Sequence, residues 1–237
     1  MTKVILVLAS LSGGASLFLC GAFLLIGPLH LVALGWSEPT ALAWDAALSL
    51  AFFVQHSVML RSGFRARLAR IIPPHTHGAL YAVVSGLVLT AAVVLWQESS
   101  TLIYGLQGPP RWLLRGLVPL SMAGFAWAAH TLSSFDPLGL AALRAHGQGK
   151  KLPPPEFTVR GPYRWVRHPL YSLSIGLIWS NPDVTADRLL FNVLWTAWIY
   201  VGTFLEEADL VAEFGEAYRD YQRRVPRLIP WQVPPGS

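Results

Sequence analysis

Two groups of residues in the last third of the sequence have side chains that could bind a charged small molecule. The first group lies within residues 160–171 and includes Arg167 and His168, and the second is the pair Glu206 and Glu207. Arginine and histidine side chains bind carboxylates, and glutamates bind ammonium groups. Together the two groups could hold a zwitterionic amino-acid headgroup. Taken one at a time, the arginines are more typical of lipid-headgroup anchors and the glutamates of a solvated helix start.

Gln55 and His56 form a second candidate site, because both are polar residues inside an apolar stretch. Polar side chains within a membrane are costly unless they pair or line a wet cavity. The two residues therefore make either a structural hydrogen bond between helices or part of a substrate pocket, with His56 as a base or Gln55 as an orienting group. His75 and His77 have no further ligand nearby in the sequence, so no metal site is predicted.

The composition indicates that a membrane protein must position these residues. Of the 237 residues, 53% are hydrophobic and 13% are charged, and the mean hydropathy is +0.45. Soluble domains carry about 25% charged residues. The single cysteine, Cys20, lies in an apolar stretch, which excludes a disulfide framework and a cysteine-based zinc cluster.

About six apolar segments are predicted to cross the membrane as helices. A crossing takes about 20 apolar residues, because a helix rises about 1.5 Å per residue through about 30 Å of hydrocarbon. The first four segments are residues 4–27, 41–60, 79–96 and 116–132, and the last two form a hairpin over residues 170–205 that is broken at residues 180–183. The first leg of the hairpin is short. A signal peptide is the alternative for the first segment, but its apolar region is usually only about 7–15 residues long.

Residues 206–224 are predicted to form an amphipathic terminal helix. They are charged, and apolar side chains recur at a spacing of three to four residues, at Leu210, Phe214, Tyr218 and Tyr221. The fold class is therefore an all-α, polytopic membrane bundle. Because a hairpin returns the chain to the side it left, we expect His168 and Glu206 to lie close together.

The distribution of basic residues predicts the orientation. The formal net charge is +5, and of the 18 Lys and Arg residues all but Arg111, Arg115 and Arg188 fall on the side of the two termini. The positive-inside rule then places both termini and the binding site in the cytoplasm, in a multi-pass protein of a bacterial inner membrane. The basic charge is explained by topology, so nucleic-acid binding is not predicted.

The last third of the chain resembles a family of integral-membrane methyltransferases that includes isoprenylcysteine carboxyl methyltransferase and phospholipid methyltransferases. The resemblance rests on residues 161–171, 206–210, 214–221, 225–226 and 229–230. It implies S-adenosylmethionine as the methyl donor, with cofactor contacts at Tyr163, His168, Pro169, Tyr171, Glu206 and Glu207, and a catalytic role for Arg167. Residues 1–132 would then form a four-helix membrane part on the substrate side. Residues 133–237 would supply the cytoplasmic loop, the hairpin and the terminal helix of the cofactor site.

The N-terminal half is similar to a narrower group, the NnrU-like proteins and methanethiol S-methyltransferases. The similarity rests on residues 52–61, 73–74 and 135–140. The chain departs from that group at residues 75–79, which read His-Thr-His-Gly-Ala, and at Ala141 and Ala142. These departures affect the substrate more than the cofactor.

The resemblance favours methyl transfer to a small apolar thiol such as methanethiol. A thiol must lose its proton before it reacts, and His56 or Asp136 could accept that proton, with Gln55 as an orienting group. The alternatives are methylation of an isoprenylcysteine carboxylate or of a lipid, and a non-catalytic NnrU-like accessory protein. A transporter is disfavoured, because the sequence shows no intramembrane charge pair and no inverted repeat. Membrane lipids are the other expected partners, and the oligomeric state is not predicted.

Overall fold

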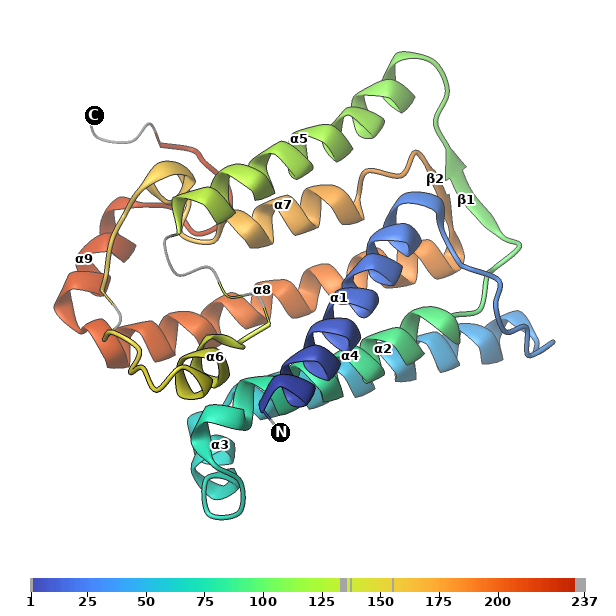
Figure 1. Cartoon of the computed structure of the whole chain (residues 1–237). Helices are drawn as coiled ribbons and strands as arrows, with labels where there is room; N and C mark the ends of the chain where they lie inside the picture. The colour runs from blue at the N-terminus through green and yellow to red at the C-terminus, as the bar shows by residue number, and fades with distance from the viewer. Residues whose placement is uncertain (1, 133–135, 137, 155, 233–237) are drawn as a thin grey trace. The chain divides into compact units, whose positions relative to one another are not determined.

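The computed structural model describes residues 2–132, 136, 138–154 and 156–232, which are mainly helical (Figure 1). The described residues contain nine α-helices, two short 3-10 helices and one two-stranded sheet. The predicted all-helical class is therefore confirmed.

Five of the described helices are long and apolar enough to cross a membrane. They are α1 (Thr2–Ile26), α2 (Glu38–Leu60), α4 (His77–Val94), α5 (Pro109–Thr131) and α8 (Ala186–Phe214). Even α4, with 18 residues, is about 27 Å long, close to the thickness of the hydrocarbon core. The chain is a multi-pass membrane protein.

The expected first leg of the hairpin is a short helix. Helix α7 (Pro169–Ile178) has 10 residues and is about 15 Å long, half of what a crossing needs. It begins at Pro169 and ends before the turn at residues 180–182, which leads into strand β2 (Asp183–Thr185). Strand β2 pairs with β1 (Leu102–Gly105), a contact that the sequence analysis did not predict. The expected six segments are therefore five long helices and one short one.

The amphipathic stretch near the C-terminus is divided between two helices. Helix α8 continues to Phe214, and α9 (Glu216–Arg224) begins after Gly215, whose φ of +59° suits glycine and strains other residues. Glu206 and Glu207 therefore lie inside α8. The prediction of one helix over residues 206–224 is wrong at this glycine.

The remaining short elements connect the long helices. They are α3 (Ser62–Leu68), η1 (Pro74–Thr76), α6 (Ala141–Gly147) and η2 (Gly161–Arg164). Helix α5 begins seven residues before the predicted segment at residue 116, because prolines fit the first turn of a helix, where the backbone N–H groups have no partner.

The chain forms two compact units, and the first comprises Met1–Leu102, Asp136–Pro154 and Thr185–Phe191. In this unit α1 and α2 both pack against α4. Small residues allow close approach: a Cβ atom on Gly86 would lie 2.7 Å from Ser12 Oγ, and one on Gly78 would lie 1.7 Å from the Gly139 carbonyl oxygen.

Two buried carboxylates hold the chain that follows α4 in the first unit. Asp187 accepts hydrogen bonds from Trp96 Nε1 at 3.1 Å and from the Ser99 backbone N–H at 3.0 Å. Asp45 accepts one from the Gln97 backbone N–H at 3.0 Å. Buried carboxylates need such donors, and here the donors fix the end of α4.

The second unit comprises Ile103–Phe135, Pro155–Val184 and Asn192–Ser237. Helices α5 and α7 lie side by side in this unit (Figure 1), and a Cβ atom on Gly124 would lie 2.5 Å from Leu173 Cδ2. A cluster of buried residues, Tyr218, Tyr221 and Val225, packs against Phe157 and so joins α9 to the segment between α6 and η2.

Candidate active site

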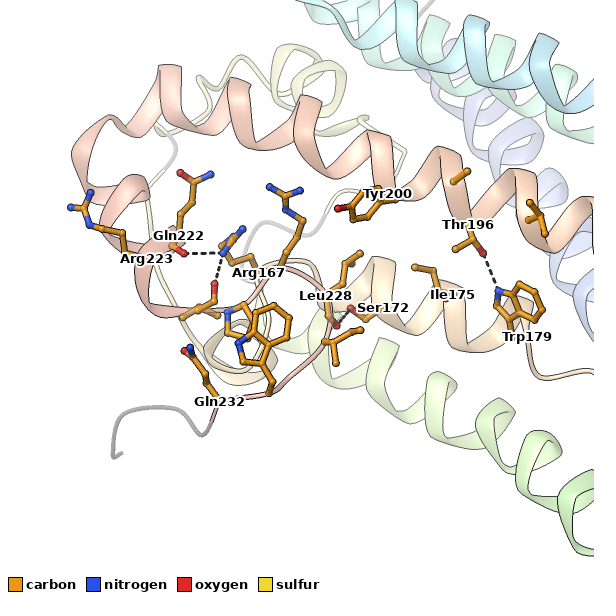
Figure 2. Close-up of a pocket in the computed structure, with 17 residues that line it drawn as sticks. Arg167, Ser172, Ile175, Trp179, Thr196, Tyr200, Gln222, Arg223, Leu228 and Gln232 are labelled. Carbon is orange, nitrogen blue, oxygen red and sulfur yellow. Dashed lines mark hydrogen bonds between the residues drawn. The ribbon is translucent and has the colours of Figure 1, made fainter.

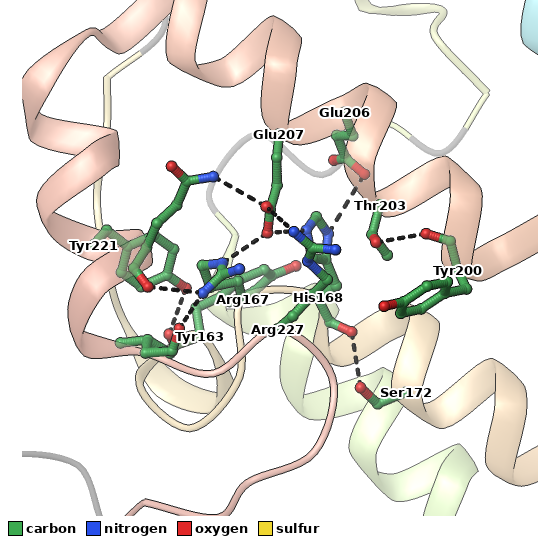
Figure 3. Close-up of polar contacts among 12 residues, drawn as sticks. Tyr163, Arg167, His168, Ser172, Tyr200, Thr203, Glu206, Glu207, Tyr221 and Arg227 are labelled. Atoms are coloured by element: carbon green, nitrogen blue, oxygen red, sulfur yellow. Dashed lines mark hydrogen bonds and ion pairs between the residues drawn. The ribbon is translucent and has the colours of Figure 1, made fainter.

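Glu207 is the centre of a buried polar network in the second unit (Figure 3). Its Oε1 accepts a hydrogen bond from Arg167 Nε at 2.7 Å and lies 3.1 Å from His168 Nε2. Its Oε2 accepts hydrogen bonds from Arg227 Nη2 at 2.9 Å and from Gln222 Nε2 at 3.0 Å. Four partners from this chain therefore surround the Glu207 carboxylate.

Arg167 and His168 are positioned by the C-terminal segment, residues 225–232, which we call the C-terminal strap. The Arg167 backbone N–H donates to the Pro226 carbonyl oxygen at 2.8 Å, and that of His168 donates to the Arg227 carbonyl oxygen at 3.1 Å. One turn further on, Ser172 Oγ donates to the Leu228 carbonyl oxygen at 2.7 Å. These bonds hold the strap along the start of α7.

Glu206 is the neighbour of Glu207 in α8, but it is bonded differently. Its Oε2 is buried and has no hydrogen-bond partner among the described residues, and it lies 3.6 Å from His168 Nδ1. The Glu206 side chain is nevertheless 46% exposed, so a ligand can reach it. A buried acceptor without a donor is costly, and an incoming ammonium group would satisfy it.

His168 stands between the two carboxylates and is buried. Burial lowers the pKa of His168, and this effect outweighs the opposing effect of Glu206 and Glu207. The ring of Tyr171 stacks on that of His168, with centroids 5.4 Å apart and planes 15° apart. A neutral imidazole leaves Arg167 and Arg227 as the permanent positive charges of the cluster.

The other predicted cofactor residues lie at the start of the same region. Pro169 is buried at the first position of α7, and Tyr163 lies in η2. The Tyr163 carbonyl oxygen accepts a hydrogen bond from Tyr221 Oη at 2.6 Å, and burial raises the pKa of the Tyr163 phenol to about 12. The structure brings Tyr163, Arg167, His168, Glu206 and Glu207 together in one unit, and their roles toward a cofactor stay predictions.

Gln55 and His56 lie in the first unit, where both contact α4. Gln55 Nε2 donates to Ser85 Oγ at 3.0 Å, while its buried Oε1 has no hydrogen-bond partner in the described part of the chain. Tyr81 Oη lies 2.9 Å from Nε2 and 3.0 Å from Nδ1 of His56. Both roles expected from the sequence therefore stay open. The contacts with α4 fit a structural hydrogen bond between helices, and the Oε1 atom of Gln55 could still accept a hydrogen bond from a substrate.

Asp136 has a local structural contact. Its Oδ2 accepts a hydrogen bond of 2.6 Å from the backbone N–H of Ala141, the first residue of α6. The N–H groups at the start of a helix need such acceptors. Its proposed role as a proton acceptor stays a prediction, and its neighbours Phe135 and Pro137 lie outside the described residues.

The histidines near η1 make local contacts. His75 stacks on His146, with ring centroids 3.6 Å apart, and His77 Nε2 lies 3.0 Å from the Ile72 carbonyl oxygen. Within the residues that the structure describes, no three His, Cys, Asp or Glu side chains are grouped so that they could hold a metal ion.

Beside the Glu207 network lies a cavity of about 950 Å³, which is lined by α7, α8, α9 and the C-terminal strap (Figure 2). Arg167, Gln222 and Arg227 belong both to the network and to the cavity wall. Gln222 and Arg227 could not be identified from the sequence, because isolated polar residues in a polar tail show no characteristic spacing. Tyr81 was missed for a similar reason, since a tyrosine in an apolar helix is ordinary.

Comparison with known proteins finds clear relatives. A methanethiol S-methyltransferase from a Pseudomonas species is 37% identical over 198 residues, which cover 83% of this chain and 76% of that protein. A methanethiol S-methyltransferase from Mycobacterium tuberculosis is 34% identical over 181 residues, or 76% of this chain and 74% of that protein. Nurim from Rattus norvegicus is 26% identical over 188 residues, or 72% and 68% of the two chains. No protein-family profile matches the chain, and no solved structure matches it significantly.

Proposed function

Because this chain belongs to the methanethiol S-methyltransferase family, we propose that it transfers a methyl group from S-adenosylmethionine to methanethiol. The methyl carbon forms a bond to the thiolate sulfur as its bond to the sulfonium sulfur breaks. Dimethyl sulfide and S-adenosylhomocysteine are the products, and the thiol proton leaves to a base. S-Adenosylmethionine supplies the activated methyl group, and the chain supplies binding, orientation and a site poor in water.

The different hydrogen bonding of Glu206 and Glu207 is the observation that supports a cofactor site here. Glu207 has four partners within the chain, whereas Glu206 keeps a buried oxygen without a donor. Arg227 Nε is also buried and has no hydrogen-bond partner among the described residues. Glu206 would hold the ammonium group of the cofactor and Arg227 its carboxylate, while Glu207 holds Arg167 and Arg227 in place. His168 and Tyr171 add a stacked, neutral surface beside these groups.

The acceptor would be handled by the N-terminal part, residues 1–132. We assign the orientation of the thiol to Gln55 Oε1, which lacks a donor, and the removal of its proton to His56, with Tyr81 holding the imidazole ring. A thiolate and a sulfonium neutralise each other as they react, so apolar surroundings favour the step. Asp136 is the alternative base, although its Oδ2 already accepts a hydrogen bond from α6.

Two measurements test this function and its site. Purified protein is given methyl-labelled S-adenosylmethionine with methanethiol, a prenylcysteine or phosphatidylethanolamine, and labelled product is measured for each. We expect turnover of methanethiol. Turnover of the prenylcysteine or the lipid alone would reject the thiol assignment.

Calorimetry with S-adenosylhomocysteine then tests the cofactor residues. We expect Glu206→Gln to weaken binding about tenfold or more, because a charged hydrogen bond contributes about 1.5–3 kcal/mol. Glu213→Gln is the matched control, since Glu213 is an exposed glutamate of the same helix. His56→Ala should retain cofactor binding and lose thiol turnover. Equal affinities for Glu206→Gln and Glu213→Gln would remove Glu206 from the site.

A further inference from the structure

The cavity beside the Glu207 network has two chemically different ends. One end, which we call the basic end, is lined by Arg167, Arg223, Arg227 and Gln222. The other, which we call the apolar limb, lies between α7 and α8 and is lined mainly by Ile175, Trp179, Val193, Ala197 and Tyr200. Figure 2 shows Arg167 and Arg223 at one end of the row of side chains and Trp179 at the other. A ligand that fills the cavity would therefore need a polar head and an apolar chain.

The apolar limb is longer than a small substrate needs. Ser172 and Trp179 both line it and are separated by seven residues of helical chain, or about 10 Å. Val193 and Tyr200 line the opposite wall with the same separation. Methanethiol has only two non-hydrogen atoms, so this length suits an extended hydrocarbon chain.

The cavity is also separate from the predicted cofactor contacts. His168, Tyr171 and Glu206 are not part of its lining. Arg167 and Arg227 are shared, because they extend from the Glu207 network to the cavity wall. What occupies the cavity would therefore touch the network at Arg167 and Arg227, and not at His168, Tyr171 or Glu206.

The charges at the basic end favour an anion. Arg167 and Arg227 both pair with the carboxylate of Glu207, so two guanidinium groups face this one carboxylate. Arg223 is paired with Glu216 and Asp220, but all three side chains are more than half exposed, and such pairs are weak. An anionic group at this end would meet guanidinium donors that suit phosphate.

The apolar limb faces the region of the hydrocarbon core. Its α8 wall lies within a helix long and apolar enough to cross the membrane, and the Val193 and Tyr200 side chains are 51% and 50% exposed. In a membrane protein such exposed side chains meet lipid. The limb is therefore accessible to an acyl chain from the bilayer.

We propose that this cavity binds an anionic phospholipid, with its phosphate at the basic end and one acyl chain in the apolar limb. Binding of this lipid is a function separate from methyl transfer. Because Pro226, Arg227 and Leu228 of the C-terminal strap line the cavity, the lipid stabilises the strap and, through Arg227, the Glu207 network. The protein should therefore be more stable with an anionic lipid than with a zwitterionic lipid that has the same acyl chains.

The test compares phosphatidylglycerol with phosphatidylcholine of identical chains on the full-length protein in detergent. Bound lipid is counted by native mass spectrometry, and the melting temperature is measured in parallel. We expect phosphatidylglycerol to be retained at least about tenfold better. Both lipids carry a phosphate, but the cationic choline group of phosphatidylcholine would be repelled by the guanidinium groups of the basic end, whereas the glycerol group of phosphatidylglycerol is uncharged. Phosphatidylglycerol should also raise the melting temperature. Equal retention of the two lipids would overturn the proposal.

Paired variants locate the lipid. Ala197→Phe should fill the apolar limb and Arg223→Gln should weaken the basic end, so both should reduce retention of phosphatidylglycerol about tenfold. Ala212→Phe and Arg219→Gln are the matched controls, because these exposed residues of α8 and α9 do not line the cavity. Lipid loss in the controls as well as in the cavity variants would contradict the site.

Two further outcomes identify other occupants and would also reject the lipid. If Ala197→Phe abolished binding of S-adenosylhomocysteine while lipid retention was unchanged, the cavity would belong to the cofactor. If Ala197→Phe converted a dimer to a monomer while lipid retention was unchanged, the cavity would be an interface between copies. Absence of thiol turnover in the wild type would refute the methyltransferase proposal alone, since lipid retention is measured without it.

Discussion

Arg167 and Glu207 form a buried ion pair, with 2.7 Å between Nε and Oε1 and side chains that are 8% and 4% exposed. Arg167 also donates from Nη1 to the carbonyl oxygens of Gln222 and Val225. One guanidinium thus joins the start of α7 to α8, to α9 and to the strap. Glu207 is the carboxylate that keeps this charge inside the protein.

Replacing Glu207 should therefore destabilise the fold. Glu207→Ala leaves Arg167 and Arg227 without their carboxylate, and removal of one partner of a buried pair costs about 3–5 kcal/mol. We expect the free energy of unfolding, measured by chemical denaturation in detergent, to fall by that amount. Glu213→Ala, at an exposed position of the same helix, should change it by less than about 0.5 kcal/mol. A stable Glu207→Ala protein would show that the network does not hold the strap.

The state of His168 predicts how stability depends on pH. Burial lowers its pKa in the folded protein below the ordinary value of about 6.5. Between these two pKa values the unfolded chain binds a proton that the folded chain does not, so folding stability decreases as pH falls below about 6.5. Above that pH the imidazole is neutral in both states and its contribution is constant.

Melting temperatures at pH 7.5, 6.5 and 5.5 would test this dependence. The His168→Gln variant is the control, because its pH dependence comes from all titratable groups other than His168. The wild type should lose more stability than the variant on acidification. Glu206, Glu207 and Arg167 are the charged groups that face His168. If acid stabilised the wild type relative to the variant, His168 would be protonated between its two glutamates.

The long helices could be predicted from sequence, because about 20 apolar residues in a row have few other stable structures. The first was expected at residues 4–27 and lies at Thr2–Ile26. The predicted proximity of His168 and Glu206 followed from the return of the chain after a turn, and their side chains are 3.6 Å apart. The apolar composition was sufficient to predict the long helices, and the turn at residues 180–183 was sufficient to predict that His168 and Glu206 lie close together.

Two of the partners of Glu207, Gln222 and Arg227, could not be predicted, because they depend on tertiary contacts between unremarkable sequence positions. Arg227 and Gln222 lie 20 and 15 residues after Glu207. They reach it only because Gly215 breaks the helix and the strap pairs with Arg167 and His168. The same break explains why the amphipathic pattern over residues 206–224 was misleading. The spacing of apolar residues shows which side chains face the protein interior, and α8 and α9 both have such a face. It does not show whether the residues form one helix or two.

Gly78 should be intolerant of any side chain. Its Cα region touches the Gly139 backbone, and a Cβ atom would lie 1.7 Å from the Gly139 carbonyl oxygen, which cannot move aside as a side chain can. We expect Gly78→Ala to reduce the free energy of unfolding by about 1–3 kcal/mol through overpacking. Gly116→Ala in α5 is the control, because nothing lies within 4 Å of its Cβ position, and it should be neutral or stabilising by up to about 1 kcal/mol. Equal effects of the two substitutions would show that α4 and residue 139 are not in contact.

The distribution of basic residues predicts the orientation of the protein across the membrane. The loop that holds Arg144, Lys150 and Lys151 should face the cytoplasm, and the loop before α5 should face the opposite side. Gln148→Cys and Gln107→Cys, each in a Cys20→Ser background, place one exposed thiol on either side. In intact cells an impermeant maleimide should label the cysteine at position 107, and the one at position 148 only after the membrane is opened. Labelling of position 148 in intact cells would reverse the orientation, and would put Glu206 and His168 on the side where S-adenosylmethionine is not made.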